Sequence, residues 1–150
     1  MKGFTCLVQP SVVRETAPSM TFHGINGDEP RLAGERCTGL VLEHFFDGRQ
    51  IEVNVVHLGI GDQWHRLYFE GSTVFWRVSA RPGSAQNTEP ARGLLLNDLS
   101  AVEGFVGHTV QGVEYHASEF GDVEVCIGFS SGRRLKLAYA AETDSAQVVD

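Results

Sequence analysis

The sequence predicts a mainly β fold, a β-rich α+β protein in which two antiparallel hairpin or meander modules pack as a sandwich or strongly curved sheet, with one short helix. Apolar residues alternate at a period of two from residue 38 onward, which is typical of half-buried strands. Turn-forming pairs such as Asp47-Gly48 divide these stretches into hairpins. A chain of 150 residues can bury a core without disulfides or metal. We therefore expect a single domain over residues 1–150.

The N-terminal third of the chain carries little strand pattern. Residues 4–9 predict one strand, because they are largely apolar and are followed by Pro10. Residues 16–34 contain Pro18, Gly24, Gly27 and Pro30 and are expected to form a loop.

Residues 38–79 predict a first β-meander of four strands, with turns near Asp47-Gly48, residues 59–62 and residues 71–72. The register of the second and third strands is chosen so that apolar side chains share one face, which places Val55 opposite Leu67 and His57 opposite His65. The same register places Val53 opposite Phe69. The expected buried face is Leu40, Leu42, Phe46, Ile51, Val53, Val55, Leu67, Phe69, Val74, Trp76 and Val78.

Residues 80–93 are rich in Pro, Gly, Ser and Asn and are expected to form a loop. Residues 94–106 are an apolar cluster with Asn97, Asp98 and Ser100 as possible helix caps, so they predict a short helix or apolar connector, helical near 98–104.

Residues 109–149 predict a second β-meander. Its apolar face carries alternating residues of 113–117, 123–129 and 135–139, and its other face is expected to be solvated. That polar face is Glu114, His116, Glu124, Arg134 and Lys136. Similar patterns at 39–42 and 112–115 fit either an internal duplication or the alternation that any two antiparallel hairpins share.

Composition limits the function classes. The formal net charge of −7 argues against nucleic acid and favours a basic partner, although such a charge also serves solubility alone. No apolar run approaches the roughly 20 residues of a membrane span, and the N-terminus lacks a secretory apolar region. Three widely spaced cysteines fit a reducing compartment. We expect a cytoplasmic protein without membrane contact.

The sequence contains no recognisable catalytic centre, so we expect no enzymatic activity and no cofactor. It lacks a Gly-x-Ser-x-Gly elbow and a phosphate-binding glycine loop. The chosen register would bring His57 and His65 together, and with Asp62 they could hold a metal ion in a small β-sheet enzyme or ligand binder. The favoured interpretation is two histidines at the rim of the core, with no metal bound.

The most specific feature is the outer face of the first meander, which should carry Trp64, Arg66, Tyr68, Phe75 and Arg77. Solvated faces seldom expose so many aromatic residues, and Trp, Tyr and Arg are enriched at binding hot spots. Either the loop at 80–90, the N-terminal segment or the short helix covers this face, or it binds a partner.

The chain resembles small uncharacterised bacterial immunity-type β proteins from toxin-immunity loci. The resemblance spans about residues 38–139 and rests on strand pattern: Trp64-His65-Arg66-Leu67-Tyr68-Phe69, Val74-Phe75-Trp76 and Val125-x-Ile127-x-Phe129-x-x-Gly132-x-x-Leu135-x-Leu137. It implies a cytosolic immunity protein that binds and occludes one cognate toxin, whose domain we expect to be basic. A structural or assembly subunit, or a homo-oligomer, is the remaining alternative.

Overall fold

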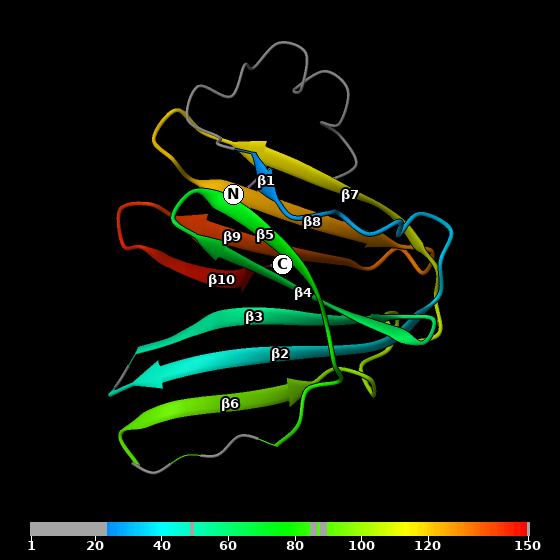
Figure 1. The fold of residues 1–150 in the computed structure, drawn as a ribbon, viewed down its shortest axis with the longest axis horizontal. Coiled ribbons are helices and arrows are strands. Elements are labelled where there is room, and N and C mark those ends of the chain that lie inside the picture. Colours follow the sequence, from blue (N-terminus) through cyan, green and yellow to red (C-terminus); the bar gives the residue numbers. More distant parts are fainter. Residues whose placement is uncertain (1–23, 49, 85–86, 88–89, 150) are drawn as a thin grey trace.

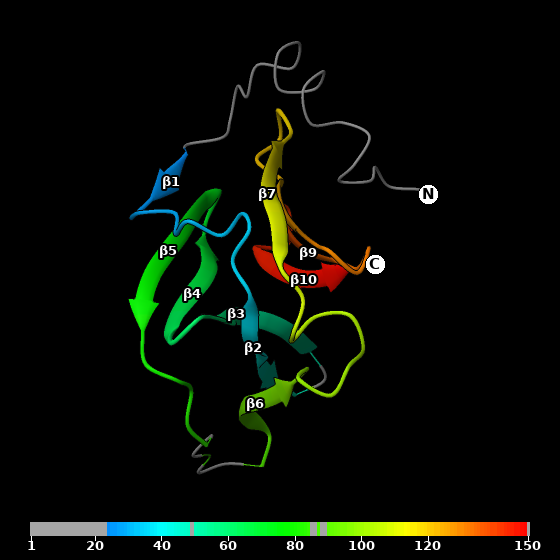
Figure 2. The ribbon, with the colours of Figure 1, turned by 90° about the vertical axis from the view of Figure 1, so that its right-hand side faces the viewer.

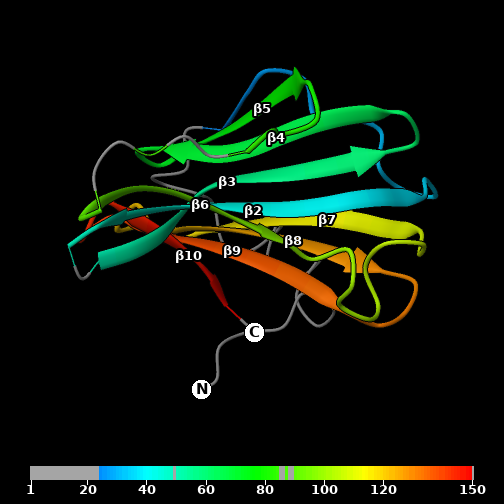
Figure 3. The same cartoon turned by 90° about the horizontal axis from the view of Figure 1, so that it is seen from below.

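Ten strands form two sheets in the computed structural model, which describes residues 24–48, 50–84, 87 and 90–149. The first sheet has the order β1-β5-β4-β3-β2-β6 and the second has the order β10-β9-β8-β7. Figure 3 shows β5, β4, β3 and β2 as one layer above the second sheet, and Figure 2 shows the curvature of the first sheet. The strands of the first sheet are β1 (Ile25–Asn26), β2 (Cys37–Asp47), β3 (Gln50–Ile60), β4 (Gln63–Glu70), β5 (Thr73–Ser79) and β6 (Arg92–Asp98). Those of the second are β7 (Val110–Ala117), β8 (Val123–Phe129), β9 (Arg134–Ala140) and β10 (Ser145–Val149).

The mainly β architecture with two antiparallel modules is confirmed. Strands β2 to β5 form the expected meander, and β7 to β10 form the second one (Figure 1). The short helix is wrong, because the described residues contain no helix. In particular, no described helix has the length and hydrophobicity of a membrane-spanning segment. The strand expected at residues 4–9 lies outside the described residues, and β1 falls inside the expected loop at 16–34.

Strand β6 occupies the first part of residues 94–106, the segment that was expected to be a short helix or apolar connector. It pairs antiparallel with the free edge of β2, so the open backbone groups of that edge outweigh local helix propensity. Asp98, expected as a helix cap, instead accepts a hydrogen bond from the backbone N–H of Ser100 at 2.9 Å, which stabilises a turn. The loop expected at 80–93 is consequently shorter, because β6 begins at Arg92.

A β-bulge in β3 corrects the predicted register. Glu43 pairs with Val55 and His44 pairs with Val53, so Asn54 is an extra residue that reverses the alternation of β3. Val56 therefore lies opposite Leu67, where Val55 was expected. The bulge keeps Val53 on the inner face, turns Val55 and His57 outward, and buries Val56 and Leu58 completely.

The core lies between the inner faces of the two sheets. Trp76, Leu67 and Phe129 are among its largest fully buried side chains. The indole N–H of Trp76 donates to the hydroxyl of Tyr115 on the second sheet at 2.9 Å, and that hydroxyl donates to Glu29 at 2.5 Å. Burial, together with the hydrogen bond to Glu29, raises the pKa of Tyr115 above the ordinary range of a phenol.

Two positions expected on the buried face of the first meander are exposed. Ile51 is 54% exposed and Val78 is 65% exposed, since both lie within two residues of a strand end. The polar face of the second sheet departs from expectation in the opposite direction. His116 and Lys136 are buried there, and of the five residues expected to be solvated only Arg134 is exposed.

Candidate functional site

The five predicted partner-binding side chains lie together on the outer face of β4 and β5. Arg66 pairs with Arg77 across the two strands and Tyr68 pairs with Phe75, while Trp64 lies two residues before Arg66 on the same face. All five are half-buried. The pattern of β4 and β5 therefore placed them correctly, although the register against β3 was wrong.

The rings and guanidinium groups on this face are stacked. The rings of Tyr68 and Phe75 lie 5.2 Å apart with an angle of 11° between their planes. The guanidinium carbon of Arg66 lies 5.5 Å from the centre of the Tyr68 ring, and that of Arg77 lies 5.1 Å from the Phe75 ring. Such contacts hold the planar groups in fixed orientations. We call this set, with Arg81, the arginine–aromatic surface.

The indole ring of Trp64 packs against two glycines. Gly39, Gly59 and Trp64 are paired across β2, β3 and β4, and a Cβ atom at Gly39 would lie only 2.4 Å from the indole Cη2. The two glycines therefore make room for the ring. Arg81, from the segment after β5, lies over the indole ring, with its guanidinium carbon 6.0 Å from the ring centre. Arg81 is a surface member that the sequence pattern did not single out, because it lies outside the strands.

A pocket of about 200 Å³ opens beside Trp64. Its walls come from β2, β4, β6 and the segment after β5: Thr38, Gly39, Val41, Trp64, Arg81, Pro82, Leu96, Asp98 and Ser100. The segment that contains Arg81 and Pro82 thus lies along one side of the outer face. This segment therefore covers part of the outer face, as expected for the loop at 80–90. The five strand residues of the surface remain half-buried.

Arg66 and Arg77 differ in their hydrogen bonds. Arg77 donates to the backbone carbonyl of Asn26 at 3.0 Å, to its side-chain oxygen at 2.6 Å and to the carbonyl of Trp76 at 2.8 Å. These bonds fasten the short edge strand β1 to β5. Arg66 makes no hydrogen bond or ion pair with any residue that the structure describes, and its buried Nε has no acceptor there.

A buried polar pair lies beside Arg66 on the same face. His57 Nε2 lies 3.0 Å from Glu43 Oε1, and Asn54, the bulged residue, donates to the other carboxylate oxygen at 2.6 Å. His57 pairs with Arg66 in the sheet, and its second ring nitrogen, Nδ1, is buried without a hydrogen-bond partner in the described chain. Period-two reasoning missed this pair because the bulge cannot be read from the alternation.

The expected pairing of His57 with His65 is wrong. His65 lies opposite Leu58 on the inner face, whereas His57 points outward, so the sheet separates the two rings. Burial lowers the pKa of His65 below its ordinary value of 6.5. Among the described residues, no group of three or more His, Cys, Asp or Glu side chains is arranged to hold a metal ion.

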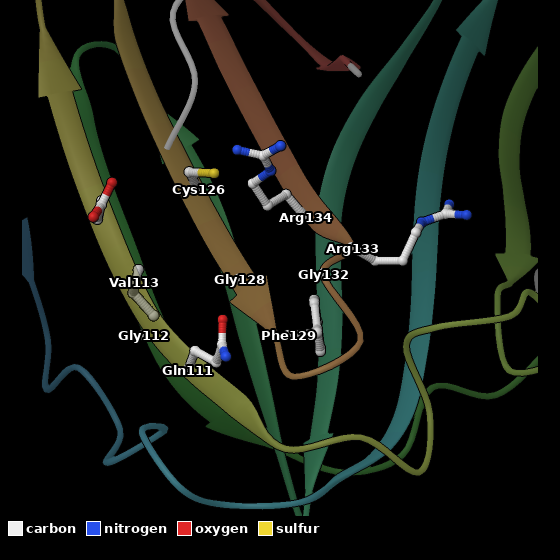
Figure 4. Close-up of a pocket in the computed structure, with 10 residues that line it drawn as sticks. Gln111, Gly112, Val113, Cys126, Gly128, Phe129, Gly132, Arg133 and Arg134 are labelled. Carbon is white, nitrogen blue, oxygen red and sulfur yellow. The ribbon is translucent and has the colours of Figure 1, made fainter. Parts of the chain in front are cut away.

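A hollow of about 400 Å³ lies on the outer face of the second sheet. Gly112 and Gly128 pair across β7 and β8, and their missing side chains leave its floor open. Figure 4 shows the side chains of Gln111 and Arg134 extending over the hollow. Arg133 turns away from it and stacks on Phe105, with its guanidinium carbon 4.6 Å from the ring centre. The sequence pattern did not indicate this hollow, because its floor joins two glycines 16 positions apart.

The arginine–aromatic surface is the better candidate of the two regions for macromolecular binding, because its aromatic and arginine groups are ordered by one another on two paired strands. Comparisons of the chain with protein-family models, with curated proteins and with solved structures found no match.

Proposed function

We propose that this protein is a non-catalytic, cytoplasmic binding protein, and specifically an immunity protein that occludes the active site of a cognate bacterial toxin. The observation that carries the proposal is the row of stacked, half-buried rings and guanidinium groups on β4 and β5. Groups already held in position lose little side-chain freedom when they bind, so more of their interaction energy appears as affinity.

Two further properties support binding by occlusion. The stacked groups belong to β4 and β5, which pair continuously from Trp64–Ser79 to Glu70–Thr73, and this pairing gives the surface a rigid backbone. The net charge of −7 would steer the protein toward a basic toxin domain and raise the association rate. Blocking a cleft requires no chemistry from the inhibitor.

The test is co-expression with each protein encoded beside its gene, scored for rescue of growth and for co-purification. We expect one neighbour to be toxic alone and harmless with this protein. Replacing Tyr68 and Phe75 together by Ala should abolish rescue and co-purification. The matched control is Phe120→Ala, which removes an aromatic ring that is 78% exposed in a turn of the second sheet.

Two results would contradict the proposal. One is a set of neighbouring proteins that are all harmless when expressed alone. The other is full rescue by the Tyr68→Ala/Phe75→Ala variant, provided that its circular dichroism and melting temperature match those of the parent protein.

A further inference from the structure

We infer that the arginine–aromatic surface recognises carboxylate groups on an acidic segment of the partner protein, and that Arg66 is the main recognition residue. This inference rests on the proposed function, which it deepens by naming the contact chemistry. It separates two effects of charge: the net charge of the chain acts at long range, whereas the arginines act only at contact distance.

The described acidic residues do not neutralise these cations. The chain has 19 acidic and 12 basic residues, so most arginines could find an acidic neighbour. Yet Arg66, Arg77 and Arg81 form no ion pair with any described residue. Three guanidinium groups gathered on one face of an acidic protein, none of them in an ion pair with a carboxylate of the described residues, are complementary to an external anion.

Arg66 also pairs directly with Arg77 across β4 and β5. Like charges directly opposite each other on antiparallel strands destabilise the sheet. A carboxylate bound between them would relieve this repulsion. The pairing therefore has a cost in the free protein that an acidic ligand would remove.

The two arginines differ in the hydrogen bonds that they already make. Arg77 already donates to Asn26 and to the Trp76 carbonyl, so its role is mainly to hold β1. The guanidinium group of Arg66 has five N–H donors, none of which is used within the described chain. A carboxylate accepts two of them side by side, which is the strongest geometry available to arginine.

The surroundings of Arg66 also favour a polar ligand. Its guanidinium group is held against the Tyr68 ring, and its cross-strand neighbour His57 also has a buried ring nitrogen, Nδ1, without a partner in the described residues. The His57 side chain is only 7% exposed, so this unused polar atom is costly in the free protein. Two unsatisfied polar groups in adjoining register positions mark the place where a polar ligand would dock.

An acidic protein segment fits this surface better than nucleic acid does. A nucleic acid carries closely spaced phosphates along its whole length, and a chain with a net charge of −7 would repel them over a long distance. A protein segment can place one or two carboxylates at the arginines while the rest of the partner stays basic.

The experiment titrates hexaglutamate into the full-length protein, followed by calorimetry and by the NMR resonance of the Arg66 Nε–H group. Hexalysine and a thymidine hexanucleotide serve as alternative ligands. We expect saturable hexaglutamate binding that weakens with salt and falls at least about tenfold in Arg66→Gln, as for a lost charged hydrogen bond. Arg134→Gln, an exposed arginine on the second sheet, should bind like the parent protein.

Four outcomes would overturn the inference: no saturable hexaglutamate binding at millimolar concentration, equal binding by both variants, tighter binding of hexalysine, or tighter binding of the nucleotide. Co-purification with the partner distinguishes failure of this inference from failure of the proposed function. If Tyr68→Ala/Phe75→Ala abolishes partner binding but Arg66→Glu does not, the function stands and the acidic contact is wrong. If neither variant affects partner binding, the proposed function fails. The hexaglutamate titration alone then tests whether the arginine–aromatic surface prefers carboxylates.

Discussion

The two faces of the β4–β5 ribbon carry alternate residues of the same strands but have different environments. On the inner face, Leu67 and Trp76 are each 1% exposed against the second sheet. On the outer face, Tyr68 and Phe75 are half-buried and contact mainly their own neighbours. A side chain one position along the strand from a core residue points to the opposite face, so it can be spared from holding the fold and is then free to serve binding.

Hydrogen bonding separates the faces in the same way. The indole N–H of Trp76, on the inner face, reaches the Tyr115 hydroxyl and through it Glu29. The Nε of Arg66, on the outer face, has no acceptor among the described residues. Trp76 therefore has its polar group satisfied within the fold, whereas Arg66 keeps a donor for which the described residues offer no acceptor.

The largest expected effect is at Trp76 on the inner face. Trp76→Ala should lower the free energy of unfolding by about 3–5 kcal/mol, because it leaves a cavity between the sheets and deprives Tyr115 of a donor. Trp76→Phe should cost less, since it keeps most of the packing and loses the hydrogen bond. Urea denaturation measures both. A loss below about 1 kcal/mol in Trp76→Ala would mean that the inner face does not carry the stability.

Gly39→Ala should have the next largest effect, because its new methyl group would collide with the Trp64 ring. Overpacking of this kind costs about 1–3 kcal/mol. In a Trp64→Ala background the same substitution should cost almost nothing, so a double-mutant cycle should show strong coupling. Equal costs in the two backgrounds would contradict the seating of the indole on the glycine pair.

The two arginines of the outer face should differ in stability. Arg77→Gln should lower the free energy of unfolding by about 1 kcal/mol, because it removes the bonds that fasten β1. Arg66→Gln should change it by less than about 0.5 kcal/mol, or raise it slightly by removing the repulsion of Arg77. Thermal melts of both variants provide the comparison. A larger loss in Arg66→Gln would assign Arg66 to the fold instead of to recognition.

The faces of β4 and β5 could be predicted because their apolar positions alternate strictly. Leu67 and Phe69 fall on one side, while Arg66 and Tyr68 fall on the other, so only one assignment buries the aliphatic groups. The second module was predicted for the same reason. This local signal placed on one face the five residues that we predict to bind a partner, without knowledge of the tertiary structure.

The register of β3 could not be predicted from the same signal. The run Val55-Val56-His57-Leu58 offers apolar residues to both faces, so the alternation fits either assignment of the faces. The bulge at Asn54 puts Val56 and Leu58 on the inner face, where Val55 and His57 were expected. Strand β6 was missed because consecutive leucines and a potential cap fit a helix equally well. Arg81, the His57–Glu43 pair and the hollow above Gly112 depend on contacts between distant segments, which no local pattern encodes.

The smallest expected effect is a pH dependence that originates at His65. Burial on the inner face lowers its pKa below 6.5, so near and below that pH the unfolded chain binds a proton that the folded protein resists. The free energy of unfolding should therefore decrease as the pH falls below about 6.5, and this contribution should be fully present above it. His65→Gln should show a shallower decrease than the parent protein in urea denaturation between pH 7.5 and 5, values chosen to span the titration of histidine at about 6.5. Identical slopes would show that the inner face accepts a charged imidazole, which would remove one of the differences between the two faces of the ribbon.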